Sequence, residues 1–323
     1  LDASGSVLQD SNLDKTIEAG NLYLTARGGS IGETGNAIDF TASNNLEATA
    51  AQAVVLNSVG RDLNTSSVTA GTSIDLSTEG SGKITVSSDL NAQGGYIRLD
   101  SAEDLELNRN LTASDYIELS SKGGDVTLLN SQITAGTYVD VDSSGAITQT
   151  NSLITAGTDI ILNAVQNIGT AGSAIAVNAA NDVRVNNATD VYLESEDTLN
   201  IAGVNASGTV DLDATKAGDV NIKGEITGDD ITIAAADNIY QSMEGQSVTA
   251  SGDVSLSAQN GDIGQTGNAI NLEAESVRAD AASGSIVING IDTDLNTNDI
   301  TAGRNIDLTT TGSGNINVQS DLN

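Results

Sequence analysis

Apolar residues in this sequence recur as short pairs of the form Ile-x-Leu or Val-x-Val, separated by stretches rich in Gly, Asn, Asp and Ser. Alternation with a period of two, bounded by such turn-forming residues, is typical of β-strands. Disordered acidic chains keep no such rhythm. We therefore expect a folded chain made of very short strands. Clear pairs are Ile74/Leu76, Ile97/Leu99, Ile117/Leu119, Val139/Val141, Ile160/Leu162, Val210/Leu212 and Val254/Leu256.

The spacing of these pairs predicts the fold class. Most intervals contain two further apolar groups, as Val126/Leu128 and Ile133 do after Ile117. Three short strands and three turns in ~23 residues match one coil of a β-helix. The sequence predicts an all-β, single-stranded parallel β-helix (β-solenoid), right-handed and three-faced, that is continuous over 1–323. We call the first residue of each apolar pair that recurs once per coil an anchor. Successive anchors lie at residues 22, 46, 74, 97, 117, 139, 160, 183, 210, 231 and 254, so their mean spacing agrees with this coil length.

A longer repeat is superimposed on this short one, at an offset of 232 in residue number. Asp62–Asn91 returns as Asp294–Asn323 with 20 of 30 positions identical, and Ser30–Phe40 returns as Asp262–Leu272. The sequence thus contains one full unit, 1–232, and the first part of the next, 233–323. We interpret it as a segment of a longer tandem array.

Composition agrees with a β-helix and argues against the other all-β architectures. There is no Pro, which could not donate a hydrogen bond to the next coil, and there are only six Tyr and one Phe. A narrow coil interior suits Val, Ile, Leu and Ala. An array of β-sandwiches needs longer strands and usually an aromatic-anchored core. Calcium-roll repeats have a nine-residue period that is not present.

The segment GGSIGETGNAIDF (Gly28–Phe40), its copy NGDIGQTGNAINL (Asn260–Leu272) and the looser QNIGTAGSAIAV (Gln166–Val177) resemble a recurring element of filamentous-haemagglutinin-like proteins. That family often has Pro where this chain has Ala37 and Ala269. Its members are giant bacterial exoproteins, commonly exported through an outer-membrane partner pore by two-partner secretion. The resemblance implies a stalk or fibre segment of an extracellular protein.

Three tyrosines form the first candidate binding site. If the anchors point inward, the residue before each anchor points outward and stacks on its equivalent one coil later, ~4.8 Å away. Tyr96, Tyr116 and Tyr138 occupy this position on three consecutive coils. They predict either an aromatic strip that stacks on sugar rings, or a self-stacking ladder that stiffens the fibre or is covered by a neighbouring fibre.

Charged residues line the neighbouring outward position. Arg98 is expected between Asp75 and Glu118 on adjacent coils, as an exposed charge ladder worth a few tenths of a kcal/mol per pair.

Two pairs of acids are expected on adjacent coils, Asp159 with Asp182 and Asp230 with Asp253. Like charges at that spacing repel, and a hard cation such as Ca²⁺ would offset the repulsion. The alternative is two solvated aspartates that splay apart. Each pair offers too few ligands for a dedicated site, so we predict at most diffuse Ca²⁺ binding and no other cofactor.

Several function classes are disfavoured. Without His or Cys there is no Ser–His or Cys–His nucleophile pair and no conventional zinc site. A net charge of −32 excludes nucleic acid as a partner, and no apolar run reaches the ~20 residues of a membrane span. Short turns and scattered basic residues disfavour a polysaccharide-degrading β-helix. We predict that the chain is not an enzyme.

The predicted function is the structural shaft of an extracellular or cell-surface bacterial filament or giant adhesin. An adhesin whose lateral faces bind glycan or host protein is the first alternative, and a β-helical polysaccharide lyase or hydrolase is the second. Expected partners are further repeats of the chain or identical subunits end to end, and neighbouring fibres, glycan or a cell surface. Because of the charge, isolated fibres should repel one another and associate with divalent cations.

Overall fold

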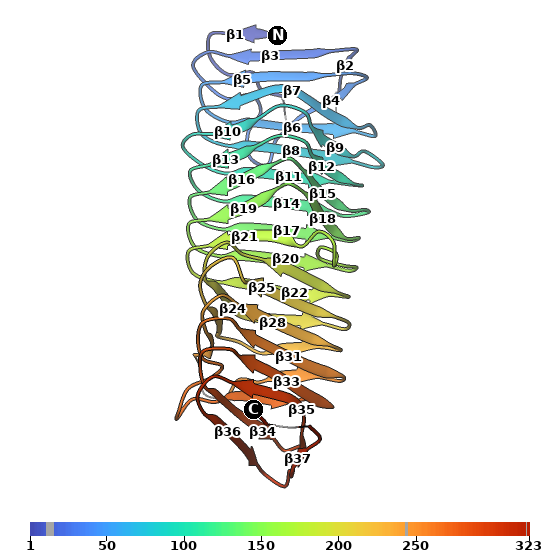
Figure 1. Ribbon diagram of the computed structural model, residues 1–323. Helices are drawn as coiled ribbons and strands as arrows, with labels where there is room; N and C mark the ends of the chain where they lie inside the picture. Colours follow the sequence, from blue (N-terminus) through green and yellow to red (C-terminus); the bar gives the residue numbers. More distant parts are fainter. Residues whose placement is uncertain (11–15, 243–244, 321) are drawn as a thin grey trace. The chain divides into compact units, whose positions relative to one another are not determined.

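The computed structural model describes residues 1–10, 16–242, 245–320 and 322–323. These residues form parallel strands stacked as a β-solenoid of about 15 turns, with no helix among them. The predicted all-β parallel β-helix is confirmed. The chain divides into two compact units, Leu1–Gln166 and Asn167–Asn323. In each unit the strands of one turn lie beside those of the next (Figure 1).

Twenty strands lie in the described residues of the first unit. They are β1 (Asp2–Ala3), β2 (Ile17–Ala19), β3 (Leu22–Ala26), β4 (Ile38–Ala42), β5 (Leu46–Ala50), β6 (Val54–Val59), β7 (Leu63–Ala70), β8 (Ile74–Glu79), β9 (Ile84–Val86), β10 (Leu90–Ala92), β11 (Ile97–Ser101), β12 (Leu105–Leu107), β13 (Leu111–Ala113), β14 (Ile117–Ser121), β15 (Val126–Leu129), β16 (Gln132–Ala135), β17 (Val139–Ser143), β18 (Ile147–Thr150), β19 (Leu153–Ala156) and β20 (Ile160–Ala164).

In the second unit the part of the chain that the structure describes forms seventeen strands. They are β21 (Ile175–Ala179), β22 (Val183–Ala188), β23 (Val191–Glu194), β24 (Leu199–Ala206), β25 (Val210–Ala214), β26 (Val220–Ile222), β27 (Ile226–Gly228), β28 (Ile231–Ala235), β29 (Ile239–Gln241), β30 (Val248–Ala250), β31 (Asp253–Ala258), β32 (Ile270–Glu273), β33 (Ser276–Ala281), β34 (Ile286–Ile291), β35 (Leu295–Ala302), β36 (Ile306–Thr311) and β37 (Ile316–Val318).

Three faces form in the first unit where one long strand is continued by two short ones. The first half of β7 pairs with β9 and its second half with β10. From there β12, β15 and β18 extend one face, and β13, β16 and β19 extend another. The third face is the stack β6, β8, β11, β14, β17 and β20. Before β7 each turn has two strands, so the predicted three-faced coil holds for part of the unit.

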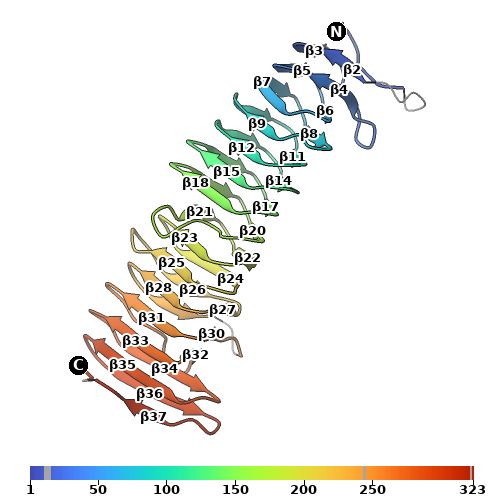
Figure 2. The ribbon, with the colours of Figure 1, turned by 90° about the vertical axis from the view of Figure 1, so that its right-hand side faces the viewer.

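The second unit splits in the same way at a different strand (Figure 2). The long strand β24 pairs with β26 through its first half and with β27 through its second. The opposite face is the stack β23, β25, β28, β31, β33 and β35. Gly203 lies at the bend of β24 with φ of 151°, a conformation that favours glycine.

The predicted anchors lie on a single face of the solenoid for only part of the chain. From Ile74 to Ile160 successive anchors pair across neighbouring turns, as predicted. Leu46, however, pairs with Thr65, and Val210 pairs with Val191. The column passes to another face at both points because strands of different faces carry the same apolar pattern. The anchor steps there, from 46 to 74 and from 183 to 210, are the two longest and exceed one turn.

The length of a turn varies around the predicted value. Leu105, Val126 and Ile147 pair at equal offsets of 21 in residue number, slightly below the prediction. Leu22 pairs with Leu46, at an offset of 24. That longer turn contains the segment 27–37, which connects β3 to β4.

Aliphatic layers fill the interior, as the composition predicts. The inward side chains of β8, β11, β14 and β17 are almost completely buried, and Phe40 is the largest buried side chain. Each inward residue packs between its equivalents one turn away, so burial repeats with every turn. The buried hydroxyls of Ser101 and Ser121 lie at the strand ends and donate to the carbonyl oxygens of Asp104 (2.8 Å) and Glu103 (2.7 Å).

Candidate functional site

The three predicted tyrosines form a continuous stack on the outside of the first unit. Tyr96, Tyr116 and Tyr138 directly precede β11, β14 and β17, whose residues pair in register. The ring centroids are 4.9 Å and 5.0 Å apart, and the ring planes differ by 3° and 4°. The structure thus confirms the predicted register of these side chains.

Stacking determines what the rings can offer a ligand. Both faces of Tyr116 are covered by its two neighbours. The guanidinium carbon of Arg98 lies over the Tyr96 ring, 5.8 Å from its centroid. Sugar recognition by an aromatic side chain needs an open ring face, whereas this stack mostly presents edges. The geometry therefore favours the self-stacking ladder, and a ligand-binding role for the three tyrosines stays a prediction.

Charged partners fix both ends of the tyrosine stack. Arg98 lies between Asp75 and Glu118 in register, as predicted, and forms an ion pair with Asp75, which is buried and not exposed as expected. This bond raises the pKa of the Arg98 guanidinium. Glu118 instead accepts a hydrogen bond of 2.8 Å from the hydroxyl of Tyr138. Burial, followed by this hydrogen bond to Glu118, raises the pKa of Tyr138.

Asp140 is the carboxylate whose electrostatics depart most from those of an exposed acid. It lies opposite Glu118 on one side and Ile161 on the other. Burial, then the charges of Asp142 and Glu118, raises the pKa of Asp140 to about 6. A part of this carboxyl population is therefore protonated just below neutral pH.

Three of the four acids in the predicted pairs, Asp182, Asp230 and Asp253, have protein partners of their own. The backbone N–H of Asp253 donates to Oδ1 of Asp230 at 2.9 Å, and the hydroxyl of Ser276 donates to Oδ1 of Asp253 at 2.6 Å. Nζ of Lys223 lies 2.6 Å from Oδ1 of Asp182. These contacts relieve the repulsion that motivated the Ca²⁺ prediction.

Asp159 lies in the first unit and Asp182 in the second, so their pairing stays a prediction. Within the described ranges, no group of three or more His, Cys, Asp or Glu side chains is placed to hold a metal ion. Diffuse Ca²⁺ binding likewise stays a prediction.

The Asp230–Asp253 contact belongs to a set of contacts that the sequence analysis did not predict. In each of them, Oδ1 of an Asp or Asn accepts the backbone N–H of a residue one turn later. The acceptor–donor pairs are Asp62–Lys83, Asp89–Asn110, Asp104–Asp125, Asn110–Gln132, Asp125–Ala146, Asn167–Asp190, Asp190–Thr209, Asp219–Asn238, Asp230–Asp253, Asn238–Asp262, Asp262–Ser285 and Asp294–Asn315. We call them the interturn Asx contacts.

A glycine often precedes the donor in these contacts. A Cβ on Gly124 would lie 2.0 Å from Oδ1 of Asp104, and a Cβ on Gly252 would lie 2.4 Å from Oδ1 of Asp230. Neither glycine has a positive φ, so the backbone conformation does not require glycine at these positions. Glycine is required because a side chain would collide with the Asp carboxylate. A Gly-Asp or Gly-Ser step one turn after an Asp or Asn was the signal available in the sequence.

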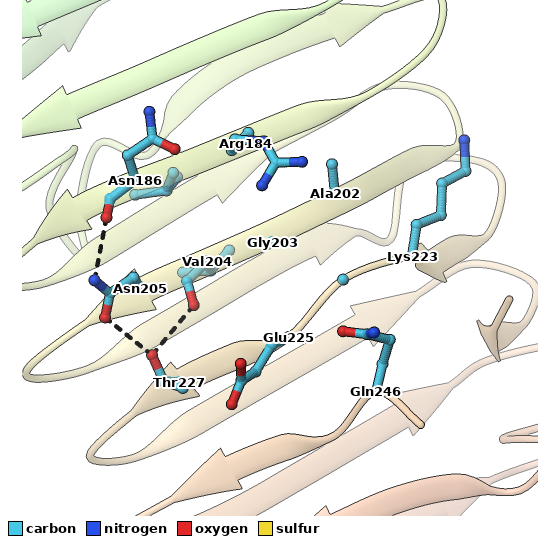
Figure 3. Close-up of a pocket in the computed structure, with 12 residues that line it drawn as sticks. Arg184, Asn186, Ala202, Gly203, Val204, Asn205, Lys223, Glu225, Thr227 and Gln246 are labelled. Carbon is cyan, nitrogen blue, oxygen red and sulfur yellow. Dashed lines mark hydrogen bonds between the residues drawn. The ribbon is translucent and has the colours of Figure 1, made fainter. Parts of the chain in front are cut away.

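A groove on the second unit was also missed from the sequence (Figure 3). It has a volume of about 510 Å³ and lies over β22, β24 and the segments that lead into β27 and β30. Polar side chains surround a floor of small residues, Ala202, Gly203 and Gly224. The single glycine inside the strand-like segment Leu199–Ala206 was the available signal, because glycine within a strand marks a bulge or a close approach.

The segment that carries the family resemblance forms a small hairpin on the first unit. Gly32 has φ of 69°, and a Cβ there would lie 2.1 Å from the carbonyl oxygen of Val55, so only glycine fits. Glu33 and Asn36 then pair as an antiparallel bridge. Nδ2 of Asn36 donates to the carbonyl oxygen of Gln9 at 2.9 Å and ties the hairpin to the preceding turn.

The second copy of this segment repeats these contacts. Gly264 has φ of 70°, Gln265 pairs with Asn268, and Nδ2 of Asn268 donates to the carbonyl oxygen of Gln241. Gln241 is the equivalent of Gln9 at the 232-residue offset. The sequence element thus corresponds to a defined structural unit.

Comparison with known families agrees with this structural unit. Residues 9–148 match the family described as Hemagglutinin repeat. This match and the β-solenoid structure fit a filamentous-haemagglutinin-like β-helical repeat over these residues. No curated protein and no solved structure matches the chain.

The family match covers one of the two copies of the internal duplication. Asp62–Asn91 lies inside the matched range, and its near-copy Asp294–Asn323 lies outside it. Hemagglutinin repeats are non-enzymatic in general and typically secreted or surface-exposed. In the described part of the chain, no helix has the length and apolarity to cross a membrane.

Proposed function

We propose that this chain is a shaft segment of an extracellular bacterial filament or giant surface adhesin. The hemagglutinin repeat and the β-helix support an adhesin-like or filament-shaft protein. The observation that carries the proposal is the parallel pairing of strands from one turn to the next, which is in register over most of the stacked strands. Leu105, Val126 and Ile147, for example, pair in sequence at identical spacing.

The mechanism of such a shaft is extension by stacking. Each added turn lengthens its stack by ~4.8 Å, so a 232-residue repeat adds roughly 50 Å. Because each turn contacts only its neighbours, reach grows with the number of repeats and needs no new interactions. Further repeats of the same chain, or identical subunits end to end, are the partners that this mechanism requires.

The test is to measure length against repeat number. Chains with one, two and three copies of the 232-residue repeat are imaged by electron microscopy. We expect thin unbranched particles that gain roughly 50 Å per copy at constant width. Separate globules, or a width that grows with copy number, would contradict the proposal.

Two observations weigh against the enzyme alternative. The longest fully described connections between strands are the short segments 27–37 and 259–269. Each contains one carboxylate, Glu33 and Asp262 respectively, so neither shelters the pair of acids that a glycosidase needs. We infer that the chain has no polysaccharide-degrading activity.

A further inference from the structure

Among the described residues, the tyrosine stack is the place where side chains that one-electron oxidants attack lie in contact. The sequence contains no Cys and no Trp, so Tyr is the side chain that most readily gives up an electron to form a crosslink. Without Cys the chain has no disulfide, and coupling of two phenols is the oxidative link that its composition allows. The ring centroids of the stack are only 4.9 and 5.0 Å apart.

Glu118 provides the proton acceptor that oxidation of a phenol needs. Removal of an electron makes the phenol hydroxyl a strong acid, so the electron is lost most easily where a base already accepts that proton. The hydroxyl of Tyr138 donates to Oε1 of Glu118 at 2.8 Å. Burial, followed by this hydrogen bond, raises the pKa of Tyr138, so the phenol is protonated at neutral pH and its oxidation has to move the proton.

Tyr23 provides the comparison within the chain. Its side chain is exposed, with 55% of its surface accessible, whereas the three stacked tyrosines are half-buried. In the described part of the chain, no aromatic ring stacks on Tyr23 and no residue accepts a hydrogen bond from its hydroxyl. An oxidant that chose tyrosines by exposure alone would therefore attack Tyr23 first, and one that needs a proton acceptor would attack Tyr138.

We propose that the tyrosine stack is a modification site at which one-electron oxidants, with Glu118 as proton acceptor, join the rings of neighbouring turns as dityrosine. The oxidant takes one electron from each of two adjacent phenols. Tyr138 passes its proton to Glu118, and Tyr116 loses its proton to water. A C–C bond then forms between one Cε carbon of each ring, and the hydrogen on each of these carbons moves to the phenol oxygen.

The net change is the loss of two electrons to the oxidant and of two protons to Glu118 and water. The product ties the turn of β14 covalently to that of β17, because Tyr116 and Tyr138 directly precede these strands. Such a link restricts the unfolded chain as a disulfide does, and so stabilises the stack of turns. The inference goes beyond the proposed shaft, since it gives the tyrosine stack a chemistry that a passive ladder does not have.

The test is oxidation of the intact chain by photogenerated tris(bipyridine)ruthenium(III), with a cobalt(III) ammine as the terminal electron acceptor. The chain is kept dilute so that links within one molecule dominate, and linked peptides are identified by proteolysis and mass spectrometry. We expect dityrosine between Tyr116 and Tyr138 as the main product, with little modification of Tyr23. Oxidised chains should also unfold at a higher urea concentration than untreated chains.

Two matched variants separate stacking from exposure. Tyr116→Phe keeps a ring in the stack but removes the central phenol, so it should abolish the dityrosine. Tyr23→Phe removes the exposed phenol and should leave the yield of dityrosine unchanged.

A third variant tests the role of the carboxylate. The amide oxygen of Glu118→Gln still accepts the hydrogen bond of Tyr138 but does not take up its proton. We expect the initial rate of crosslinking to fall about tenfold or more, because a positioned proton acceptor contributes at least that much. Imidazole added as a soluble base should restore part of the rate, which a purely structural effect of the substitution would not allow.

Four outcomes would overturn the proposal: modification mainly of Tyr23, dityrosine that persists in Tyr116→Phe, links that form only between molecules, or an unchanged rate in Glu118→Gln. If Glu118→Gln does not fold, the comparison of Tyr116→Phe with Tyr23→Phe still decides. The length measurement on tandem repeats does not depend on this chemistry, so the crosslink and the shaft can fail separately.

Discussion

At the scale of single residues, stacking of the tyrosines removes ring faces from contact with water. Tyr96, Tyr116 and Tyr138 project from the outside of the solenoid, where an isolated ring would leave both faces in water. Stacking at 4.9 and 5.0 Å covers the inner faces and adds a favourable ring–ring contact between turns. The stack therefore acts as a side-chain counterpart of the backbone ladder beneath it.

Removing the central ring should reveal this contribution. Tyr116→Ala is expected to lower the free energy of unfolding by ~1–3 kcal/mol, because two ring pairs are lost. Tyr116→Phe should leave it nearly unchanged, whereas Tyr138→Phe should lower it by ~1 kcal/mol through loss of the bond to Glu118. Urea titrations of the three variants provide the measurement. A Tyr116→Ala chain as stable as the unaltered one would refute a structural role for the stack.

Asp140 predicts a local pH dependence. Its folded pKa of about 6 exceeds the ~3.9 of an unfolded Asp, so the folded state holds the proton more tightly. The charged carboxylate therefore destabilises the fold above pH 6, and this penalty fades as pH falls to ~4. After allowance for partial exposure, Asp140→Asn should raise the free energy of unfolding by ~1 kcal/mol at pH 7.5 and by almost nothing at pH 4.

The measurement is a pair of urea titrations, one at each pH, and the control is Glu33→Gln. Glu33 is exposed and loses the same charge from the same unit. If both substitutions stabilise equally, or if the gain for Asp140→Asn does not depend on pH, the assigned cause is wrong.

At the scale of elements, the sequence predicts the register between strands of one face better than it predicts which face each strand joins. The run Ile74–Ile160 and the position of Arg98 between Asp75 and Glu118 follow directly from the period-two pattern. The pattern is silent on which face a strand joins, because all faces bury the same side chains. It also gives no sign that β7 and β24 each span two faces, which depends on how the chain bends at the corners.

The interturn Asx contacts lead to a test of how corners are held. Gly252→Ala would place a methyl group 2.4 Å from Oδ1 of Asp230, which accepts the N–H of Asp253. We expect this substitution, and Asp230→Ala, each to cost ~1–2 kcal/mol of unfolding free energy. The double variant should cost ~1 kcal/mol or more below the sum, because the methyl group fits once the carboxylate is gone.

Urea titration of the four chains gives the coupling. If the unfolding free-energy costs of the two single substitutions simply add, the Asp230 carboxylate is not the reason why position 252 requires glycine. Adding Ca²⁺ should leave all four chains unchanged if the Asp230 carboxylate serves the backbone, and a selective stabilisation of the chains that retain Asp230 would restore the metal prediction.

At the scale of the whole molecule, the net charge of −32 takes on a structural meaning. Many of the aspartates accept a backbone N–H group of the next turn through Oδ1. At Asp294 the N–H of Asn315 lowers the carboxyl pKa. The acidic composition thus follows in part from the need for acceptors at the corners, and not only from contact with water.

The candidate sites were predicted unevenly for the same reason. The tyrosine column lies on a regular face, so period-two counting located it correctly. The groove on the second unit depends on a register shift between β22 and β24 and on the exact path of a corner, neither of which leaves a periodic trace in the sequence. The contact of Asp182 with Lys223, two turns further along the chain, was likewise not predicted.

The interturn Asx contacts also have a consequence for how such a chain can change over generations. The acceptor is a side chain and must stay Asp or Asn, whereas the donor is backbone and accepts any residue other than Pro. Asp125, Ala146, Thr209 and Ser285 all serve as donors. Mutation can therefore change a donor residue without loss of the contact wherever that residue is not itself an acceptor for the next turn, as at Thr209 and Ser285. A lineage built on this fold can alter what it displays to its surroundings while the scaffold beneath stays the same.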